Sequence, residues 1–367
     1  MKRRDSGFTL IEILIAVAIV GFVLAAASTF FIMSVKQYKT QTKIVETNIE
    51  GILGLELLRR DMESLGFGLP WNNLPTSTPL YSETSADNLS TLNDFPNAPR
   101  AAAGIDNAAF TVNRSDYLTV KSVTVGTADA AGKWTTLTQA GTTRNWGSTE
   151  ENIAGTEYVI VLALGSTDAN RRSLVNPASP YAQFSSTAAY VPTEPYSANI
   201  VYGVDGSPPM RPFNRADYYV ANASSNPPVT VPLRCAPNTG VLVKGFVSHD
   251  NNGTLNLLPL LDCVADMQVV YGLDVDGNGS VDQWTNAGGL PAAGATAAAT
   301  MRTQLREIRV SILAQEGMRD DSYTHPVNPI YVGMADAGFG NNFDITGYTN
   351  YRWKVYHLAV KPWNLAQ

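Results

Sequence analysis

The chain has 367 residues, of which 16% are charged and 44% are hydrophobic, and its formal net charge is −6. Beyond Lys2 to Arg4 the sequence has no block of basic residues, which excludes the basic surface needed to bind nucleic-acid phosphates. The many Gly, Pro, Ser, Thr and Asn residues favour a β-rich protein with long loops over a helical bundle.

The basic residues at the N-terminus precede an uncharged run from Ile13 to Val35. A helix of about 23 residues is long enough to cross the roughly 30 Å hydrocarbon core of a bilayer and too long for a signal-peptide core. We expect one membrane span, with Lys2 to Arg4 in the cytoplasm and the rest of the chain in the periplasm. A buried core helix is the alternative.

Glu12 lies at the start of this apolar stretch, where a carboxylate in hydrocarbon costs about 3 kcal/mol or more. Such a charge needs a partner, unless the side chain reaches the membrane surface. With Gly7 and Phe8, Glu12 completes the pattern Gly-Phe-Thr-Leu-Ile-Glu behind a short basic leader. This pattern resembles the processing site of type IV prepilins.

The resemblance implies a sequence of events at these three residues. Prepilin peptidase would cut between Gly7 and Phe8, and the new amine of Phe8 would be N-methylated. In an assembled fibre, the Glu12 carboxylate would neutralise the Phe8 ammonium of a neighbouring subunit. The implied fold is α+β, type IV pilin-like: a long N-terminal α-helix, half of it transmembrane, packed on a mainly antiparallel β-sheet head.

The helical pattern continues past the span, because apolar residues recur at three- and four-residue intervals on one face. No proline interrupts it before Leu69, although many type IV pilins have a helix-kinking proline, and Gly66 and Pro70 give a stop signal. We expect a cleaved leader at 1–7, a transmembrane half at 8–35, a periplasmic amphipathic half at 36–66 and a head at 67–367. The apolar positions of the amphipathic half are Val45, Ile49, Ile52, Leu55, Leu58, Met62 and Leu65.

The head contains several stretches with strand character. One of them places Ile308, Val310 and Ile312 on a single face, which predicts a sheet that packs against the helix. A Pro- and Ser-rich stretch from Pro70 to Arg100 is typical of a surface loop, and residues 176–232 indicate a long insertion on the head. The predicted strands are Tyr117 to Val125, Glu157 to Leu164, Val241 to Val247, Asp266 to Leu273, Leu305 to Gln315 and Tyr351 to Val360.

The two cysteines, Cys235 and Cys263, both lie downstream of the span and therefore on the same side of a membrane. In an oxidising compartment they would pair, and the bridge would contribute about 3–4 kcal/mol in the chain-entropy model. The alternative is two unpaired buried thiols.

The stretch from Asp274 to Asp282 has the spacing of a calcium loop. Its candidate Ca²⁺ ligands alternate as in the first nine positions of an EF-hand, but Thr285 stands where the bidentate Glu belongs, which predicts a weak site with Kd of about 10⁻⁴ to 10⁻³ M. An ordinary turn is the alternative. The candidate ligands are Asp274, Asp276, Asn278, Ser280 and Asp282.

Shorter downstream motifs resemble PilW-like minor pilins, which implies a non-catalytic subunit for the assembly, initiation or tip of a type IV pilus. Its partners would be prepilin peptidase, other minor and major pilins through their N-terminal helices, and inner-membrane lipid. After assembly the chain would lie in the pilus or at the cell surface. The motifs are Leu57 to Met62, Ser115 to Val120, Leu260 to Cys263, Tyr271 to Asp274 and Val360 to Leu365.

Two other functions remain open from the residues. A J-type pseudopilin of type II secretion shares the processing signature. A membrane-anchored enzyme or adhesin displayed by prepilin processing belongs to another class, and aromatics such as Trp71, Tyr190 and Tyr196 would then line a ligand groove. The histidines His249, His325 and His357 form no recognisable catalytic or metal motif, which argues against an enzyme.

Overall fold

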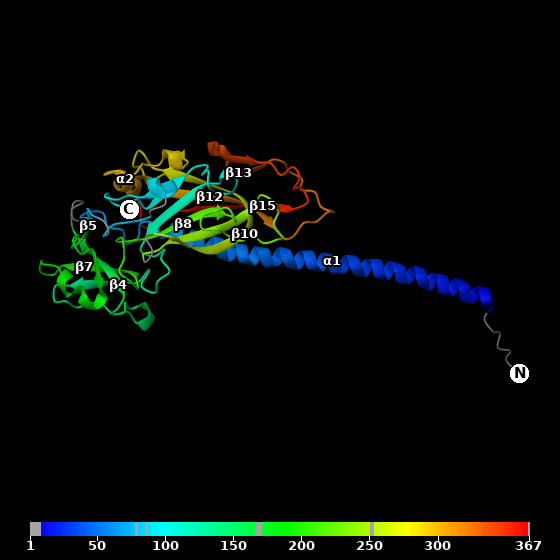
Figure 1. Ribbon diagram of the computed structural model, residues 1–367, viewed down its shortest axis with the longest axis horizontal. Helices are drawn as coiled ribbons and strands as arrows, with labels where there is room; N and C mark the ends of the chain where they lie inside the picture. The colour runs from blue at the N-terminus through cyan, green and yellow to red at the C-terminus, as the bar shows by residue number, and fades with distance from the viewer. Residues whose placement is uncertain (1–8, 78–79, 85–86, 166–170, 250–252, 366–367) are drawn as a thin grey trace.

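The computed structural model describes residues 9–77, 80–84, 87–165, 171–249 and 253–365. One long helix, α1 (Leu10–Glu63), extends from a β-rich head and contacts it only near its C-terminal end (Figure 1). Its 54 residues correspond to about 81 Å of unbroken α-helix. The predicted stop is confirmed, because the chain turns after Ser64 through Gly66 and Gly68, both at positive φ.

An eight-stranded antiparallel sheet forms the centre of the head. Five of its strands, β2, β9, β10, β12 and β15, were predicted wholly or partly from the sequence, whereas β1, β8 and β11 were not. Its order is β1-β2-β8-β9-β10-β12-β15, with β11 paired to one end of β10. The strands are β1 (Ala102–Ile105), β2 (Tyr117–Ser122), β8 (Asn214–Ala221), β9 (Gly240–Val247), β10 (Leu255–Leu273), β11 (Gln283–Thr285), β12 (Leu305–Glu316) and β15 (Arg352–Val360).

The C-terminal end of α1 packs on one face of this sheet, as the alternation in β12 predicted. Ile308, Val310 and Ile312 are fully buried in the same cluster as Leu58 and Met62 of the helix. The predicted apolar stripe is wrong at its N-terminal end, because Val45 and Ile52 are exposed. Ile52 faces away from the head, against which the neighbouring Gly51 and Gly54 are buried.

Two loop-rich caps cover the opposite face of the sheet. One cap comes from residues 80–84, 87–101 and 106–112, on either side of β1, and includes the 3₁₀ helix η1 (Asp87–Leu92). The other contains a two-stranded hairpin that packs on Leu313 and Trp353. The hairpin strands are β13 (Ile330–Met334) and β14 (Phe339–Phe343), and a short helix, α2 (Ala297–Gln304), precedes β12.

A second, smaller antiparallel sheet lies between β2 and β8 in the chain and forms its own lobe (Figure 1). It has a core of its own around Leu137, Val159 and Val201. Its order is β3-β7-β4-β5, with β6 paired to β4. The strands are β3 (Trp134–Thr138), β4 (Tyr158–Leu164), β5 (Arg171–Leu174), β6 (Tyr181–Gln183) and β7 (Ala198–Asp205).

The predicted insertion at 176–232 is wrong in its bounds. Strand β7 belongs to the lobe, but β8 is an interior strand of the main sheet between β2 and β9. The chain therefore leaves the main sheet after Ser122 and returns at Asn214. The Pro- and Ser-rich composition that suggested one excursion belongs to the turns on either side of these two strands.

The described residues between Pro70 and Arg100 form no strand, as predicted, apart from an isolated bridge at Asn72. This stretch is not simply a surface loop, because Glu83 and Asp94 are buried. The ammonium of Lys121 lies 2.6 Å from Glu83 and 2.5 Å from Asp94. Arg215 of β8 lies 3.1 Å from Glu83. The acids hold this segment on the sheet by pairing with cations whose burial would otherwise be costly.

Candidate functional site

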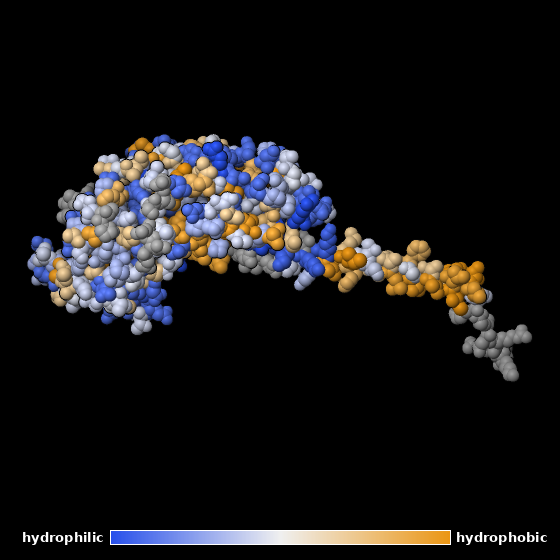
Figure 2. Space-filling view, in the orientation of Figure 1, coloured by the Kyte–Doolittle hydropathy of each residue, from blue (hydrophilic) through white to orange (hydrophobic). Residues whose placement is uncertain are grey.

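The N-terminal half of α1 is the largest exposed apolar surface among the described residues (Figure 2). The most apolar 18-residue stretch of residues 10–43 has a mean hydropathy of 2.8, and none of it is buried in the head. Leu10 and Phe22 are about four-fifths exposed, at 80% and 79%. A segment of this length and composition is suited to a bilayer or to a bundle of similar helices.

Glu12 closes a capping box at the start of α1. Its carboxylate accepts hydrogen bonds from the backbone N–H and the hydroxyl of Thr9, both at 2.8 Å, while its own N–H donates to the Thr9 hydroxyl at 3.4 Å. The sequence reasoning missed this role, although Thr9-Leu-Ile-Glu12 has the S/T-x-x-E spacing that signals it. The predicted cleavage and methylation residues, Gly7 and Phe8, lie outside the described residues.

Asp61 joins the other end of the helix to the sheet. It accepts hydrogen bonds from the hydroxyl of Tyr218 and from the ammonium of Lys244. Burial raises the pKa of the Asp61 carboxyl, and the charge of Lys244 acts in the opposite direction. A buried charge paired in this way fixes the rotation of α1 on the head, because turning the helix would leave Lys244 buried without a counter-ion.

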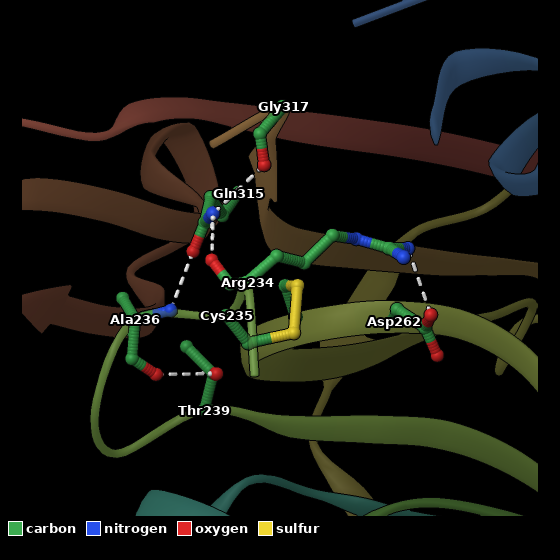
Figure 3. Close-up of a disulfide and its surroundings, with 8 residues drawn as sticks. Arg234, Cys235, Ala236, Thr239, Asp262, Gln315 and Gly317 are labelled. Atoms are coloured by element: carbon green, nitrogen blue, oxygen red, sulfur yellow. Dashed lines mark hydrogen bonds and ion pairs between the residues drawn. A yellow bond between two sulfur atoms is a disulfide. The ribbon is translucent and has the colours of Figure 1, made fainter. Parts of the chain in front are cut away.

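The two cysteines form the predicted bridge, which Figure 3 shows. Cys235 precedes β9, and Cys263 lies in an irregular part of β10 where the register with β9 shifts. The bond therefore ties the loop before β9 to the strand that runs through the middle of the sheet.

Hydrogen bonds from β12 hold the same loop (Figure 3). The amide of Gln315 accepts from Ala236 N–H at 2.6 Å and donates to the carbonyl of Arg234 at 2.9 Å. Arg234 also pairs with Asp262 at 2.8 Å. The bridge is thus part of a cross-linked corner of the head and has the surroundings of a structural disulfide.

The predicted metal loop gathers three carboxylates. Ligand oxygens of Asp274, Asp276 and Asp282 all lie within 4.8 Å of one another. Gly277 and Gly279 adopt positive φ, which lets backbone N–H groups turn inward. The Asp274 carboxylate accepts from the N–H groups of both glycines, at 2.7 and 2.9 Å. The loop therefore brings the predicted acidic ligands together.

Thr285, which stands in the position of the bidentate Glu of an EF-hand, lies in β11 with its hydroxyl 3.2 Å from the Asn286 carbonyl. A contact from β12 was not foreseen. Arg306 of β12 donates to Asp274 through Nε and a terminal nitrogen, at 2.9 and 2.5 Å. Desolvation acts to raise the pKa of Asp274, but the Arg306 and backbone hydrogen bonds outweigh it and lower that pKa.

The histidines have structural partners, as expected. Buried His249 accepts from Met210 N–H at 3.1 Å and lies 2.9 Å from the side-chain oxygen of Asn214. Burial lowers the pKa of His249 well below its usual value, so this ring stays neutral. His357 contacts the Ser311 hydroxyl at 3.0 Å, and His325 contacts backbone carbonyls.

Two of the three aromatics considered for a ligand groove have other roles, whereas Tyr196 is fully exposed. Tyr190 is buried in the lobe and donates to the Ser179 carbonyl at 3.0 Å. The ring of Trp71 lies 5.0 Å from the guanidinium of Arg172 and 4.1 Å from that of Arg302, so it links the lobe to α2. Packing within the head therefore explains the positions of the Tyr190 and Trp71 rings.

Comparison with known protein families agrees with this architecture. Residues 2–28 match the prokaryotic N-terminal methylation motif, and residues 217–362 match the family described as Type IV Pilus-assembly protein W. The second match begins in β8 and ends just after β15, so it covers β9 to β12 and β15 of the main sheet and leaves β1, β2 and the lobe outside. No curated protein and no solved structure was found to match the chain.

The two matches cover the N-terminal processing signature and the sheet on which α1 packs. They favour a pilus subunit over a secretion pseudopilin and over a displayed enzyme or adhesin. The exposed apolar helix and the antiparallel head are the fold that such a subunit requires. Over these residues the chain resembles PilW-like type IV prepilins, and the two matches support a minor type IV pilin that prepilin peptidase processes.

Proposed function

We propose that this minor pilin is a non-catalytic subunit that joins other pilins through the N-terminal half of α1. The observation that supports the proposal is the exposed apolar surface of residues 10–43, which the head leaves uncovered. Before assembly, lipid of the inner membrane covers this surface. In a fibre, the corresponding helices of neighbouring minor and major pilins replace the lipid.

The topology follows from the charges that flank the span. Lys2 to Arg4 remain in the cytoplasm, the helix crosses the inner membrane once, and the head lies in the periplasm. The Cys235–Cys263 bridge supports this orientation, because disulfides persist in oxidising compartments.

Glu12 provides the electrostatic part of assembly. It is the sole acidic residue between Leu10 and Lys43, so it is the one negative charge that a neighbouring Phe8 ammonium can meet in the span. Cleavage between Gly7 and Phe8 would create that ammonium only one residue before the cap residue Thr9. The capping box orients the carboxylate toward the start of the helix, where such a pair would form.

The size of the head favours a position for this subunit at the end of the fibre. Both the main sheet and the lobe extend from the side of one helix end (Figure 1). A subunit of this size is difficult to accommodate at every step of a thin fibre, whereas a terminal subunit leaves the lobe unobstructed. We infer a role in a tip or initiation complex with other minor pilins.

The loop from Asp274 to Asp282 is a weak Ca²⁺ site in this proposal. Three gathered carboxylates support it. Arg306 already neutralises part of the charge on Asp274, and the twelfth-position carboxylate is missing, so the affinity should be low. Calcium would stiffen the β10–β11 connection and supply no chemistry.

The experiment uses a cleavage-blocked variant. Gly7→Val should leave the leader attached, so the precursor should stay in the membrane and no cross-link to other pilins should form. The wild-type chain should lose its leader and cross-link through residues of the N-terminal half of α1 such as Phe30, which is 73% exposed. Equal cross-linking of both proteins would contradict the requirement for processing.

A further inference from the structure

Three lysines follow the apolar run of α1. Lys36, Lys39 and Lys43 are three and four residues apart, so they lie on one face of the helix, and all three are exposed. They are the only basic residues of the sequence between Phe8 and Val45. We call these three residues the lysine row.

The length of the helix places the lysine row at a bilayer surface. Residues 10–35 correspond to about 39 Å of α-helix, which exceeds the roughly 30 Å hydrocarbon core and approaches the thickness of a bilayer with its headgroups. Lys36 therefore lies among the headgroups, and Lys43 lies about 10 Å farther along the helix axis. Side chains of an α-helix lean toward its N-terminus, so the long stems of these lysines extend back toward the membrane.

Tyr38 marks the same level by a different chemistry. It lies between the first two lysines in the sequence and is 71% exposed. An exposed tyrosine at the end of an apolar span is typical of a membrane interface, where the ring contacts the acyl chains and the hydroxyl contacts water. The tyrosine and the lysine row therefore indicate one interface.

The rest of the periplasmic chain offers little attraction to a negatively charged membrane surface. Residues 64–367 contain 18 basic and 25 acidic side chains, which gives a formal net charge of −7. The nearest acids after the lysine row, Glu46 and Glu50, lie farther from the bilayer along the helix. Attraction to anionic headgroups at this surface therefore has to come from the lysine row.

We propose that the lysine row binds the phosphate groups of anionic phospholipids in the periplasmic leaflet of the inner membrane. The orientation of the span in this proposal rests on the proposed function. An ammonium has three N–H donors, so a lysine that makes a local contact on the helix also reaches a phosphate oxygen. Each lysine near an anionic surface strengthens binding by roughly fivefold, and added salt weakens the attraction.

This contact would hold the mature subunit in the membrane. Cleavage after Gly7 removes Lys2 to Arg4, which are the basic residues on the cytoplasmic side of the span. The lysine row stays with the helix, so the periplasmic end of α1 remains bound to headgroups after processing. Entry of α1 into a fibre would then require that these phosphate contacts break.

The test uses the full chain in phosphatidylcholine vesicles with trace spin-labelled lipids, whose electron paramagnetic resonance separates lipid in contact with the protein from bulk lipid. At low salt, phosphatidylglycerol should contact the chain about three- to fivefold more strongly than phosphatidylcholine, and about 0.5 M NaCl should reduce this preference. Changing all three lysines of the row to Gln should lower the preference below about twofold. The leader contributes equally to both proteins, so the difference reports the lysine row.

The matched control removes the same charge from the head. Arg114→Gln, Arg319→Gln and Lys361→Gln together change three exposed cations outside the membrane, and this variant should keep the wild-type lipid preference. Both triple variants should melt at the wild-type temperature, because all six side chains are exposed. Inorganic phosphate at about 10 mM should leave the preference in place, because the lipid holds many phosphates at one surface.

Three results would overturn the proposal: no preference for phosphatidylglycerol in the wild-type chain, an unchanged preference without the lysine row, or an equal loss in the control. The measurement needs no pili. A chain that prefers phosphatidylglycerol but never enters a fibre would contradict the proposed function and leave the lipid site standing. A chain that enters fibres and shows no lipid preference would contradict the lipid site alone.

Discussion

Glu12 illustrates how one side chain serves local structure and assembly together. As the third residue of the helix, it completes the capping box with Thr9. As the sole acid of the span, it is also the proposed partner for the Phe8 ammonium of a neighbour. The two roles depend on different properties, because a cap needs an acceptor oxygen whereas ion pairing needs a charge.

Three substitutions separate these roles. Glu12→Gln keeps an acceptor for the capping box and removes the charge, so incorporation into fibres should fall roughly tenfold or more, as for Glu12→Val. Thr9→Ala removes the capping hydroxyl and keeps the charge, so incorporation should stay near the wild-type level. Leader removal, followed by mass spectrometry, should be normal in all three. Wild-type incorporation of Glu12→Gln, measured by immunoblot of sheared fibres, would refute the charge-pairing mechanism.

The metal loop makes a second prediction for single residues. With a Kd near 10⁻³ M, about 5 mM Ca²⁺ should raise the melting temperature of the chain by about 2 °C. Asp276→Ala should abolish the rise, whereas Asp336→Ala, which removes an exposed acid outside the loop, should not. Arg306→Gln should tighten Ca²⁺ binding, because it removes a competing positive charge from Asp274. A melting temperature insensitive to Ca²⁺ would indicate an ordinary turn.

At the scale of elements, the sequence correctly predicted the helices and strands in which apolar residues recur at regular spacing. Helix α1 and strand β12 each bury one regular apolar face. Strand β8 was missed because Asn214, Arg215 and Asp217 resemble turn residues, yet all are buried. Ala216 and Tyr218 are two residues apart and both face the helix, and this alternation could have predicted the strand. The partners that allow its charges to be buried, Glu83 above all, are far away in the chain and could not be inferred from local pattern.

Gly54 shows how an apparent weakness of a helix can be a packing requirement. A methyl group at this position would lie 2.1 Å from the carbonyl oxygen of Leu260 in β10. The glycine therefore allows the helix backbone to approach the strand backbone directly. Gly21, in the exposed half of the same helix, has no neighbouring atom within 4 Å of such a methyl group.

The two glycines make a matched pair for a stability experiment. Alanine has the higher helix propensity, by up to about 1 kcal/mol, so a helix on its own would gain from either change. Gly54→Ala should instead lower the melting temperature of the head by several degrees, because α1 must move away from β10. Gly21→Ala should leave it unchanged. Thermal unfolding followed by circular dichroism measures both, and equal melting temperatures would contradict the close contact.

At the scale of the whole molecule, the two faces of the main sheet bury different kinds of side chain. The helix side of the main sheet is almost entirely apolar, whereas the opposite side contains acids beneath the two caps. Burial raises the pKa of Asp116 to about 7, with backbone hydrogen bonds from Asn107 and Val269 acting against it. Burial also raises the pKa of Asp266 to about 6, with Gln268 acting against it.

These shifts predict how stability depends on pH. Between the ordinary carboxyl pKa of 3.8 and the raised values, the folded head binds more protons than the unfolded chain, so its stability falls as pH rises through this window. The melting temperature should therefore be about 2–4 °C higher at pH 5.5 than at pH 8. Asp266→Asn should reduce this difference. A melting temperature that rises from pH 5.5 to pH 8 would show that these carboxyls are charged in the folded head.

The account as a whole requires that the cleaved chain becomes part of a fibre. The most direct measurement is mass spectrometry of the N-terminal peptide of this chain in purified, sheared pili. The account predicts a peptide that begins at Phe8 and carries one methyl group on its amine. Recovery of the chain only from the membrane fraction of piliated cells, or only with Gly7 and the leader still attached, would contradict it.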